Sequence, residues 1–209
     1  MSDKKDNKLQ FDEQNQIESE WTRDIKAGNQ KAFEKLFNFY CQPLINFTRR
    51  YVVDIQIAEN IVQDVFVHVW NHRMNLDPSR LIKSYLFKAV KNEALKEIRH
   101  RDVEKRSQQK LIDLIEPDID PEKELTTNEM NKEIHQAINE LPDKCREIFK
   151  MNRFDGLKYA EIAEILNISE KTVETQMGRA LKKLRVRLKP LLPLFLSVLL
   201  ILLIIFSMS

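Results

Sequence analysis

The stretch DGLKYAEIAEILNISEKTVETQMGRALKKLRVR, residues 155–187, decides the fold of the chain. Apolar residues recur at helical spacing in its first part and predict a short helix over Tyr159–Leu166. A tight turn follows, and a second helix begins at Glu170, with Ser169 before it as a favourable N-cap. The small side chain of Ala163 allows the two helices to cross closely. The stretch therefore predicts a helix–turn–helix.

The second helix of this pair has an apolar face and a polar face. The apolar stripe is spaced four, three, four and four residues, at Val173, Met177, Ala180, Leu184 and Leu188. The outward face is polar at its start and basic at its end: Lys171, Thr172, Glu174, Thr175, Gln176, Arg179, Lys182 and Lys183. Such a helix fits the DNA major groove, where its early residues reach base edges and its later cations hold phosphates. The helix–turn–helix at 159–178 is therefore a candidate DNA-binding site, and a solvated surface helix is the alternative.

The composition favours an all-α protein made of two small helical domains. Glycine is scarce, at 3 of 209 residues, charged residues make up 32%, and strand-like alternation is hard to find. Residues 102–133 carry ten acids and five bases, a net charge of −5, whereas residues 171–189 carry seven bases and one acid, a net of +6. An acidic stretch between more basic parts suggests a linker between modules that share an anionic partner.

The N-terminal part contains several helical patterns. Residues 1–17 are polar, which predicts a frayed end and excludes a signal peptide. Asn29 can cap a helix, which Pro43 bends or ends before an apolar pattern resumes at Leu44–Val53. We expect a second strong helix over Ala58–Arg73.

Two faces of these helices are candidates for binding. On the helix over 58–73, Phe66 and Trp70 belong to the apolar side, and Gln63 and Asp64 on the polar side suit a protein partner. Ser84 is expected to cap a third helix over Tyr85–Arg101, with Tyr85 inward. Basic residues of the outward face are interleaved with the aromatic Tyr85 and Phe87, a pattern that suits nucleic acid, and a solvated basic face is the alternative. The outward positions include Lys88, Lys91, Asn92, Lys96, Arg99 and Arg101.

The second module follows a segment without periodicity. Residues 102–131 contain two prolines and many acids and predict a flexible linker. A helix then ends at Pro142, and Asp143 is expected to cap the next one. With the helix–turn–helix, this module has about four helices.

Four segments now carry a resemblance to RNA polymerase sigma factors of the extracytoplasmic-function (ECF) class, over about residues 20–189. AGNQKAFEKLFNFY resembles the start of sigma region 2, and AENIVQDVFVHVW the helix that docks on the polymerase clamp. SYLFKAVKNEALKEIR resembles the segment that melts and reads the −10 element. INELPDKCREIF, with the helix–turn–helix, resembles region 4, which reads the −35 element. The occurrence of all four segments in this order is more specific for the family than any one segment alone.

The resemblance implies a division of the chain and of its roles. The expected parts are a disordered N-terminus (1–19), region 2 (20–101), an acidic linker (102–130), region 4 (131–189) and a hydrophobic tail (190–209). The residues implied to bind core polymerase are Gln63, Asp64, Val65, Phe66 and Trp70. Those implied to contact the −10 element are Lys88, Asn92, Arg99 and Arg101. The implied partners are core RNA polymerase, promoter DNA and an anti-sigma factor, with no enzymatic activity and no cofactor or metal.

The sequence departs from many ECF relatives in the recognition helix. Thr172, Val173, Arg179 and Ala180 match the family pattern. Glu174 and Gln176 replace residues that are basic in many relatives, so the −35 sequence that is read could differ. Gly178 lies in mid-helix at a cost of about 1 kcal/mol relative to alanine, which close approach to DNA could explain. The variant TVETQMGRALKKL resembles sigma factors of Bacteroidetes.

Residues 191–208, LLPLFLSVLLILLIIFSM, are uncharged and follow a cationic flank. Their 18 residues are at the lower limit for a spanning helix. The cationic flank would stay on the cytoplasmic side, so the segment is a candidate membrane anchor. A segment buried against a protein partner is the alternative. The rival functional interpretation is a stand-alone helix–turn–helix regulator. Cys41 and Cys145 are expected in the core, and their spacing suits neither a metal site nor a redox site. His68 and His72 lie four residues apart, and we interpret this spacing as a coincidence on a helix surface.

Overall fold

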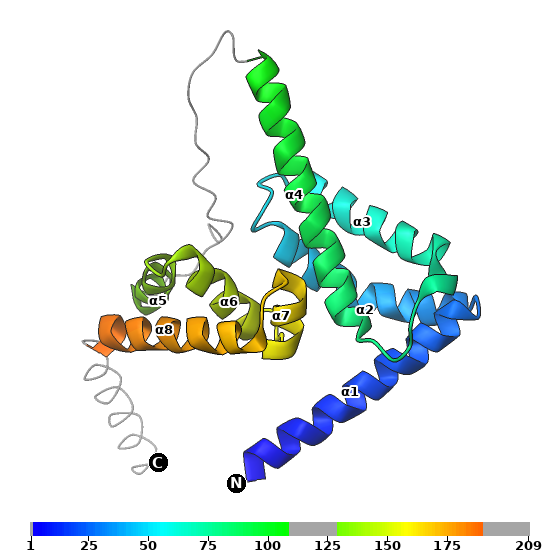
Figure 1. Cartoon of the computed structure of the whole chain (residues 1–209), viewed down its shortest axis with the longest axis horizontal. Helices are drawn as coiled ribbons and strands as arrows, with labels where there is room; N and C mark the ends of the chain where they lie inside the picture. Colours follow the sequence, from blue (N-terminus) through cyan, green and yellow to red (C-terminus); the bar gives the residue numbers. More distant parts are fainter. Residues whose placement is uncertain (1, 109–128, 190–209) are drawn as a thin grey trace, which may run out of the picture. The chain divides into compact units, whose positions relative to one another are not determined.

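The computed structural model describes residues 2–108 and 129–189, and within these ranges all regular structure is helical (Figure 1). The expected all-α fold class is confirmed. The chain divides into two compact units, the first with α1–α4 and the second with α5, α6, α8 and most of α7. The helices are α1 Ser2–Lys26, α2 Gln30–Thr48, α3 Ile55–Asn71, the 3₁₀ turn η1 Arg73–Asn75, α4 Ile82–Gln108, α5 Glu129–Asn139, α6 Asp143–Arg153, α7 Tyr159–Leu166 and α8 Glu170–Leu188.

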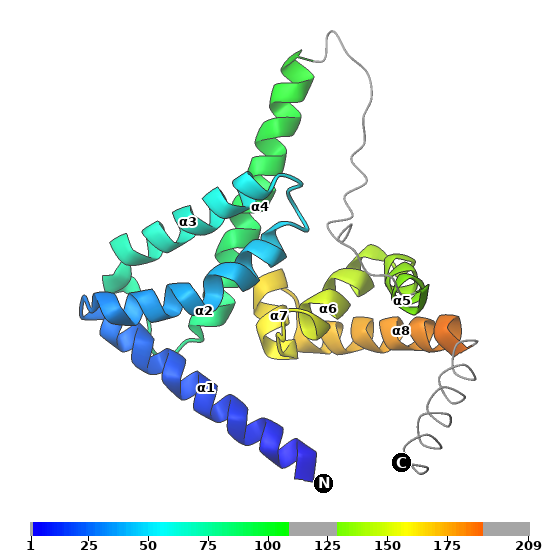
Figure 2. The same ribbon diagram turned by 180° about the vertical axis from the view of Figure 1, so that it is seen from behind.

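The core of the first unit lies among α2, α3 and α4, which pack on one another in both views (Figures 1 and 2). Asn29 caps α2 as expected, since its side chain accepts hydrogen bonds from the backbone N–H groups of Lys31 and Ala32. Phe47 of α2 and Phe87 of α4 are both fully buried, with their ring centroids 5.0 Å apart in an edge-to-face arrangement. Aromatic contacts therefore hold α4 against α2 through Phe87, and α3 against α2 through Phe66, whose ring centroid lies 4.9 Å from that of Phe37.

Several expected helix boundaries in this unit are wrong. Pro43 was expected to bend or end α2, and the ending is wrong, because α2 runs through Pro43 to Thr48. Pro43 itself is exposed, whereas Leu44 and Phe47 beyond it are fully buried. Helix α3 begins at Ile55 rather than Ala58, because Asp54 accepts a hydrogen bond from the Gln56 N–H at 2.9 Å.

The ends of α1 and α4 also differ from expectation. Helix α1 begins at Ser2, where the polar composition predicted a frayed end. Ser84 is not a cap, because α4 already begins at the buried Ile82 and Ser84 lies inside its first turn with no exposed surface. At the other end α4 continues to Gln108, so the first seven residues expected in the linker, 102–108, are helical.

The second unit forms the expected helix–turn–helix. The bounds of α7 and the start of α8 are those predicted. Asn167 takes a left-handed backbone conformation (φ 54°), a position that asparagine tolerates, and the Ile168 N–H closes the end of α7 on the Ala163 carbonyl at 3.0 Å. Ser169 caps α8, accepting a hydrogen bond from the Thr172 N–H at 3.1 Å.

The apolar stripe of α8 is largely as predicted. Val173, Met177, Ala180 and Leu184 are buried, and Leu188 is half-buried. One cap in this unit is wrong: Pro142, and not Asp143, precedes α6, since the Asp143 carboxylate instead accepts a hydrogen bond from the Arg146 guanidinium.

Two expectations fall outside the described residues. They are the central part of the linker, 109–128, and the hydrophobic tail at 191–208. Within the residues that the structure describes, no helix is both long and apolar enough to cross a bilayer.

Candidate nucleic-acid and polymerase interfaces

The first two turns of α8 present a set of polar side chains to solvent. Lys171, Thr172, Glu174 and Thr175 are all exposed, as predicted for a recognition helix. The Lys171 ammonium lies 2.7 Å from a Glu174 carboxylate oxygen. Each hydroxyl already has a partner: Thr172 is 2.8 Å from the Ser169 hydroxyl, and Thr175 donates to the Lys171 carbonyl at 2.8 Å. This end of α8 is therefore locally ordered by its own side chains.

Further along α8, the expected outward residues do not all share one environment. Arg179, Lys182 and Lys183 are exposed cations, suited to phosphates. Gln176 is half-buried, and its side-chain oxygen accepts a hydrogen bond from the Cys145 thiol of α6 at 3.0 Å. Both residues line a groove of about 670 Å³ between the α5–α6 segment and α8, and the three cations line the same groove. The hydrogen bond from Cys145 and the partial burial of its side chain therefore distinguish Gln176 from the exposed cations.

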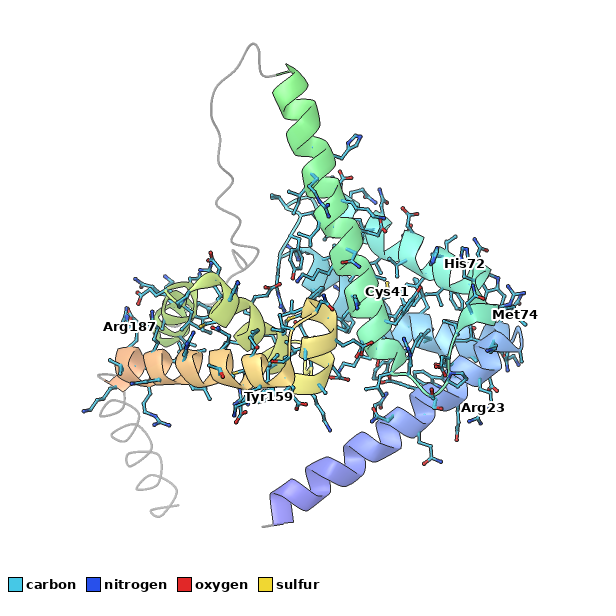
Figure 3. The ribbon with its side chains drawn as sticks, viewed as in Figure 1. Arg23, Cys41, His72, Met74, Tyr159 and Arg187 are labelled. Atoms are coloured by element: carbon cyan, nitrogen blue, oxygen red, sulfur yellow. The ribbon has the colours of Figure 1, made fainter. Side chains whose placement is uncertain are left out.

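Ion pairs join the last turn of α8 to α5 and to the residue that follows α5. The Arg187 guanidinium lies 3.0 Å from a carboxylate oxygen of Glu140 and 3.3 Å from one of Glu133 (Arg187 is labelled in Figure 3). The hydrogen bond to Glu140, followed by its charge, raises the pKa of Arg187. Although its charge suits DNA, Arg187 thus has a structural role within the second unit.

The residues expected to bind core polymerase lie on α3 but divide between surface and core. Gln63 and Asp64 are exposed, whereas Val65 and Phe66 are buried in the first unit. Trp70 is half-buried, with its ring 5.0 Å from that of Phe33 and the Arg73 guanidinium 4.8 Å above it. Only part of this predicted set can therefore contact a partner directly.

The structure brings residues expected for the two functions of region 2 into one groove. Asp64 of α3 lines a groove of about 490 Å³ with Lys88, Asn92 and Lys96 of α4. Arg99 is exposed one further turn along α4.

Arg101 does not share this face. It lies thirteen residues after Lys88, roughly 220° around the helix axis. Its guanidinium pairs with Glu97 at 2.8 Å. The expected −10 set thus separates into three residues on the groove side and one on the far side.

The two aromatic residues of α4, both expected to be interleaved with the basic residues, lie in different environments. Phe87 is 1% exposed and packs in the core, so it does not contribute to the basic face. Tyr85, expected to face inward, is 40% exposed and lines the groove beside Lys88. Partial burial raises the pKa of Tyr85, so its hydroxyl keeps its proton at neutral pH. Tyr85 is the aromatic side chain of α4 that can contact a ligand.

Two exposed apolar side chains, on α3 and just after it, were not among the predicted contact residues. Val67 is 57% exposed and Met74, in η1, is 65% exposed. Figure 3 labels Met74 together with His72, which follows the last turn of α3. Val67 falls on the polar side of the predicted helix, a position where an apolar residue is a signal for a partner. Met74 lies outside any periodic segment, so no pattern identifies it.

Family profiles match both units of the chain. A profile described as "Sigma-70 region 2" matches residues 36–103, and one described as "Sigma-70, region 4" matches residues 131–184. The first profile includes α3 and the groove on α4, and the second includes the helix–turn–helix.

Curated relatives and solved structures are similar over most of the chain. The ECF RNA polymerase sigma factor SigW of Bacillus subtilis is 28% identical, over 81% of this chain and 95% of the relative. The ECF RNA polymerase sigma-E factor of Escherichia coli is 23% identical, over 80% and 92%.

The fold resembles that of CnrH, solved in complex with the cytosolic domain of CnrY, at a TM-score of 0.57 and 22% identity over 83% of this chain and 98% of that one. RpoE of Bartonella quintana, solved with the anti-sigma factor NepR, has the same TM-score and identity over 76% and 98%. These relatives do not bear on the Bacteroidetes-like variant, which stays a prediction.

Proposed function

Because the chain belongs to the sigma-70 family of RNA polymerase sigma factors, we propose that it acts as an ECF sigma factor, which binds core RNA polymerase and directs initiation at a particular class of promoters. The observation that carries this proposal is the order of the parts. A region 2 unit and a region 4 unit with a complete helix–turn–helix occur in one chain. Members of this family are transcription factors rather than enzymes.

We assign the separate steps to the exposed members of each predicted set. Gln63 and Asp64 on α3 contact core polymerase, supported by their exposure and by the exposed Val67 on the same helix. Lys88 and Asn92 contact the −10 element from the neighbouring groove, and α8 contacts the −35 element. Two DNA-binding modules in one chain raise each other's effective concentration at a promoter, so neither needs high affinity alone.

Control by an anti-sigma factor is part of the proposal. The structures of CnrH and of RpoE described above are complexes, one with the cytosolic domain of CnrY and one with the anti-sigma factor NepR. We extend this mode of control to the present chain and expect its anti-sigma factor to cover surfaces of regions 2 and 4. A protein that co-purifies with the chain and blocks its transcription in vitro would identify that factor.

Run-off transcription with core polymerase on a genomic promoter library tests the proposed function. We expect transcripts that depend on both proteins and that start downstream of a shared pair of −35 and −10 elements. Absence of core-dependent transcripts, with tight binding of duplex DNA by the chain alone, would contradict the proposal and favour a stand-alone regulator.

The site of action is the cytoplasm, because core polymerase and promoter DNA are there. Tethering to the inner membrane through residues 191–208 stays a prediction from the sequence. Fractionation of cells that produce the full chain, or a chain ending at Lys189, tests it. Equal recovery of both forms in the soluble fraction would contradict tethering.

A further inference from the structure

The hydrogen bonds at the start of α8 show which side chains remain available to read a base pair. Thr175 uses its only O–H on the Lys171 carbonyl, and the Thr172 hydroxyl is engaged with that of Ser169. Gln176 accepts a hydrogen bond from Cys145 and lies half-buried at the side of the helix. Of the residues predicted for base contact, Lys171 and Glu174 therefore present the most accessible polar groups.

Lys171 and Glu174 form one compact donor–acceptor unit. The ammonium and a carboxylate oxygen are 2.7 Å apart, and the two side chains are 80% and 58% exposed. They lie three residues apart, within the first two turns of the helix, where a helix–turn–helix protein contacts base edges. This unit thus offers a carboxylate acceptor directly beside an ammonium donor.

The major-groove edge of a C·G pair has the complementary arrangement. Cytosine presents the N4 amino donor, and guanine presents the O6 and N7 acceptors beside it. We propose that Glu174 accepts from cytosine N4 while Lys171 donates to guanine O6 or N7, so that the pair selects C·G at one position of the −35 element. This inference rests on the proposed function and names the base pair that its recognition helix reads.

An A·T pair also has a donor beside an acceptor, but it fits less well. Adenine N7 is an acceptor next to the N6 donor, and it would repel the Glu174 carboxylate. Thymine offers Lys171 only O4, with the C5 methyl group beside it. Cytosine has no acceptor next to N4, and guanine has two acceptors for the ammonium. The pair therefore discriminates in favour of C·G.

The charge balance of α8 makes a carboxylate acceptable in this position. A glutamate alone would be repelled by the phosphates on both sides of the groove, and the Lys171 ammonium offsets that charge at 2.7 Å. Arg179, Lys182 and Lys183 follow further along the helix and supply exposed cations for the backbone. Base recognition and phosphate contact are thus assigned to different turns of the same helix.

Transcription by the full chain with core polymerase, on promoters with a randomised −35 element, tests the inference. Each promoter carries a transcribed barcode that identifies its −35 element, so that sequencing of the transcripts should show C·G preferred at one position. Glu174→Gln should move that preference to A·T by about tenfold, since glutamine binds adenine N6 and N7 together. Lys171→Met should weaken the preference for C·G at the same position.

Lys182→Gln provides the matched control, because it removes one charge from the same helix at a predicted phosphate contact. It should reduce transcription from all promoters alike and leave every base preference unchanged. Initiation by the wild-type chain without a C·G preference, or with one that Glu174→Gln leaves unchanged, would overturn the inference while the proposed function stands. Absence of any core-dependent transcript would overturn the proposed function and the inference with it.

Discussion

The Cys145 thiol donates a hydrogen bond to the side-chain oxygen of Gln176, 3.0 Å away, and so joins α6 to α8. The thiol is 3% exposed, and no sequence pattern connects two residues that lie 31 positions apart. Gln176 was predicted to read bases, yet the structure gives its oxygen a partner inside the second unit.

We expect Gln176→Ala to affect stability rather than promoter choice. The variant loses the hydrogen bond from Cys145, which lowers the free energy of unfolding by about 0.5–1.5 kcal/mol. Urea denaturation measures this change, and transcription from a promoter library measures the base preference. Cys145→Ala should produce a similar loss of stability. A new base preference in Gln176→Ala would show that Gln176 does contact DNA.

Local sequence patterns determine some features of the second unit but not the environment of Gln176. The bounds of α7, the Ser169 cap and the buried stripe at Val173 and Met177 were predictable, because each follows from local spacing or from a capping side chain. Gln176 is half-buried while the other residues of the predicted outward face are exposed, because it accepts a hydrogen bond from Cys145 of α6, and this contact forms only in the folded unit. Tertiary contacts of this kind carry no local signal.

The predicted helix boundaries were wrong where the burial of apolar side chains outweighed a local signal for a helix end or start. Pro43 and Ser84 are local signals for a helix end and a helix start, but both lie inside helices. Apolar residues beyond Pro43 and before Ser84 are buried and hold the backbone helical through these positions. Packing also decides which of the two aromatic residues of α4 is buried, because Phe87 and not Tyr85 contacts Phe47.

Gly178 offers a test of how closely α8 approaches DNA. A Cβ atom built at this position would meet nothing within 4 Å, so the fold itself does not require glycine there. Gly178→Ala should therefore raise the free energy of unfolding by about 1 kcal/mol, the usual difference in helix propensity. Urea denaturation provides the measurement.

The same variant should bind −35 DNA more weakly if the backbone of α8 lies against the groove wall. Transcription from a matched promoter at limiting protein concentration measures this effect. Gain of stability with undiminished transcription would contradict the close approach, and loss of stability would contradict the open space around Gly178.

The two aromatic residues of α4 should respond differently to truncation. Phe87→Ala leaves a cavity in the core and should lower the free energy of unfolding by about 3–5 kcal/mol. Tyr85→Ala removes a side chain that is 40% exposed and should cost much less stability, but it should impair opening of the −10 element.

Thermal unfolding and permanganate footprinting of the open complex measure the two effects. Tyr85→Phe is the control, because it keeps the ring and removes only the hydroxyl. An intact open complex in Tyr85→Ala would exclude Tyr85 from DNA contact.

Ser169 should support the helix–turn–helix through its cap. Ser169→Ala removes the acceptor for the Thr172 N–H and should lower the free energy of unfolding by about 1 kcal/mol. Ser169→Asp should retain most of that stability, since its carboxylate can accept the same hydrogen bond. Urea denaturation measures the stability of both variants. A loss in Ser169→Asp as large as that in Ser169→Ala would contradict the capping role.

Cys41 should react slowly with thiol reagents at neutral pH. Burial, and secondly the negative charge of Glu59, raise the pKa of the Cys41 thiol. Its contribution to stability is therefore complete below the unfolded value of about 8.5 and is lost as the pH rises through the higher folded value.

Mass spectrometry of iodoacetamide alkylation against pH measures this pKa directly. Glu59→Gln should lower the Cys41 pKa only partly, because burial is the larger cause and remains in the variant. Cys145, which is 3% exposed, is the internal control and should be alkylated more slowly than Cys41 at every pH at which the chain stays folded. A midpoint for Cys41 at or below the ordinary thiol value would contradict the partial burial of this side chain as the cause of the shift.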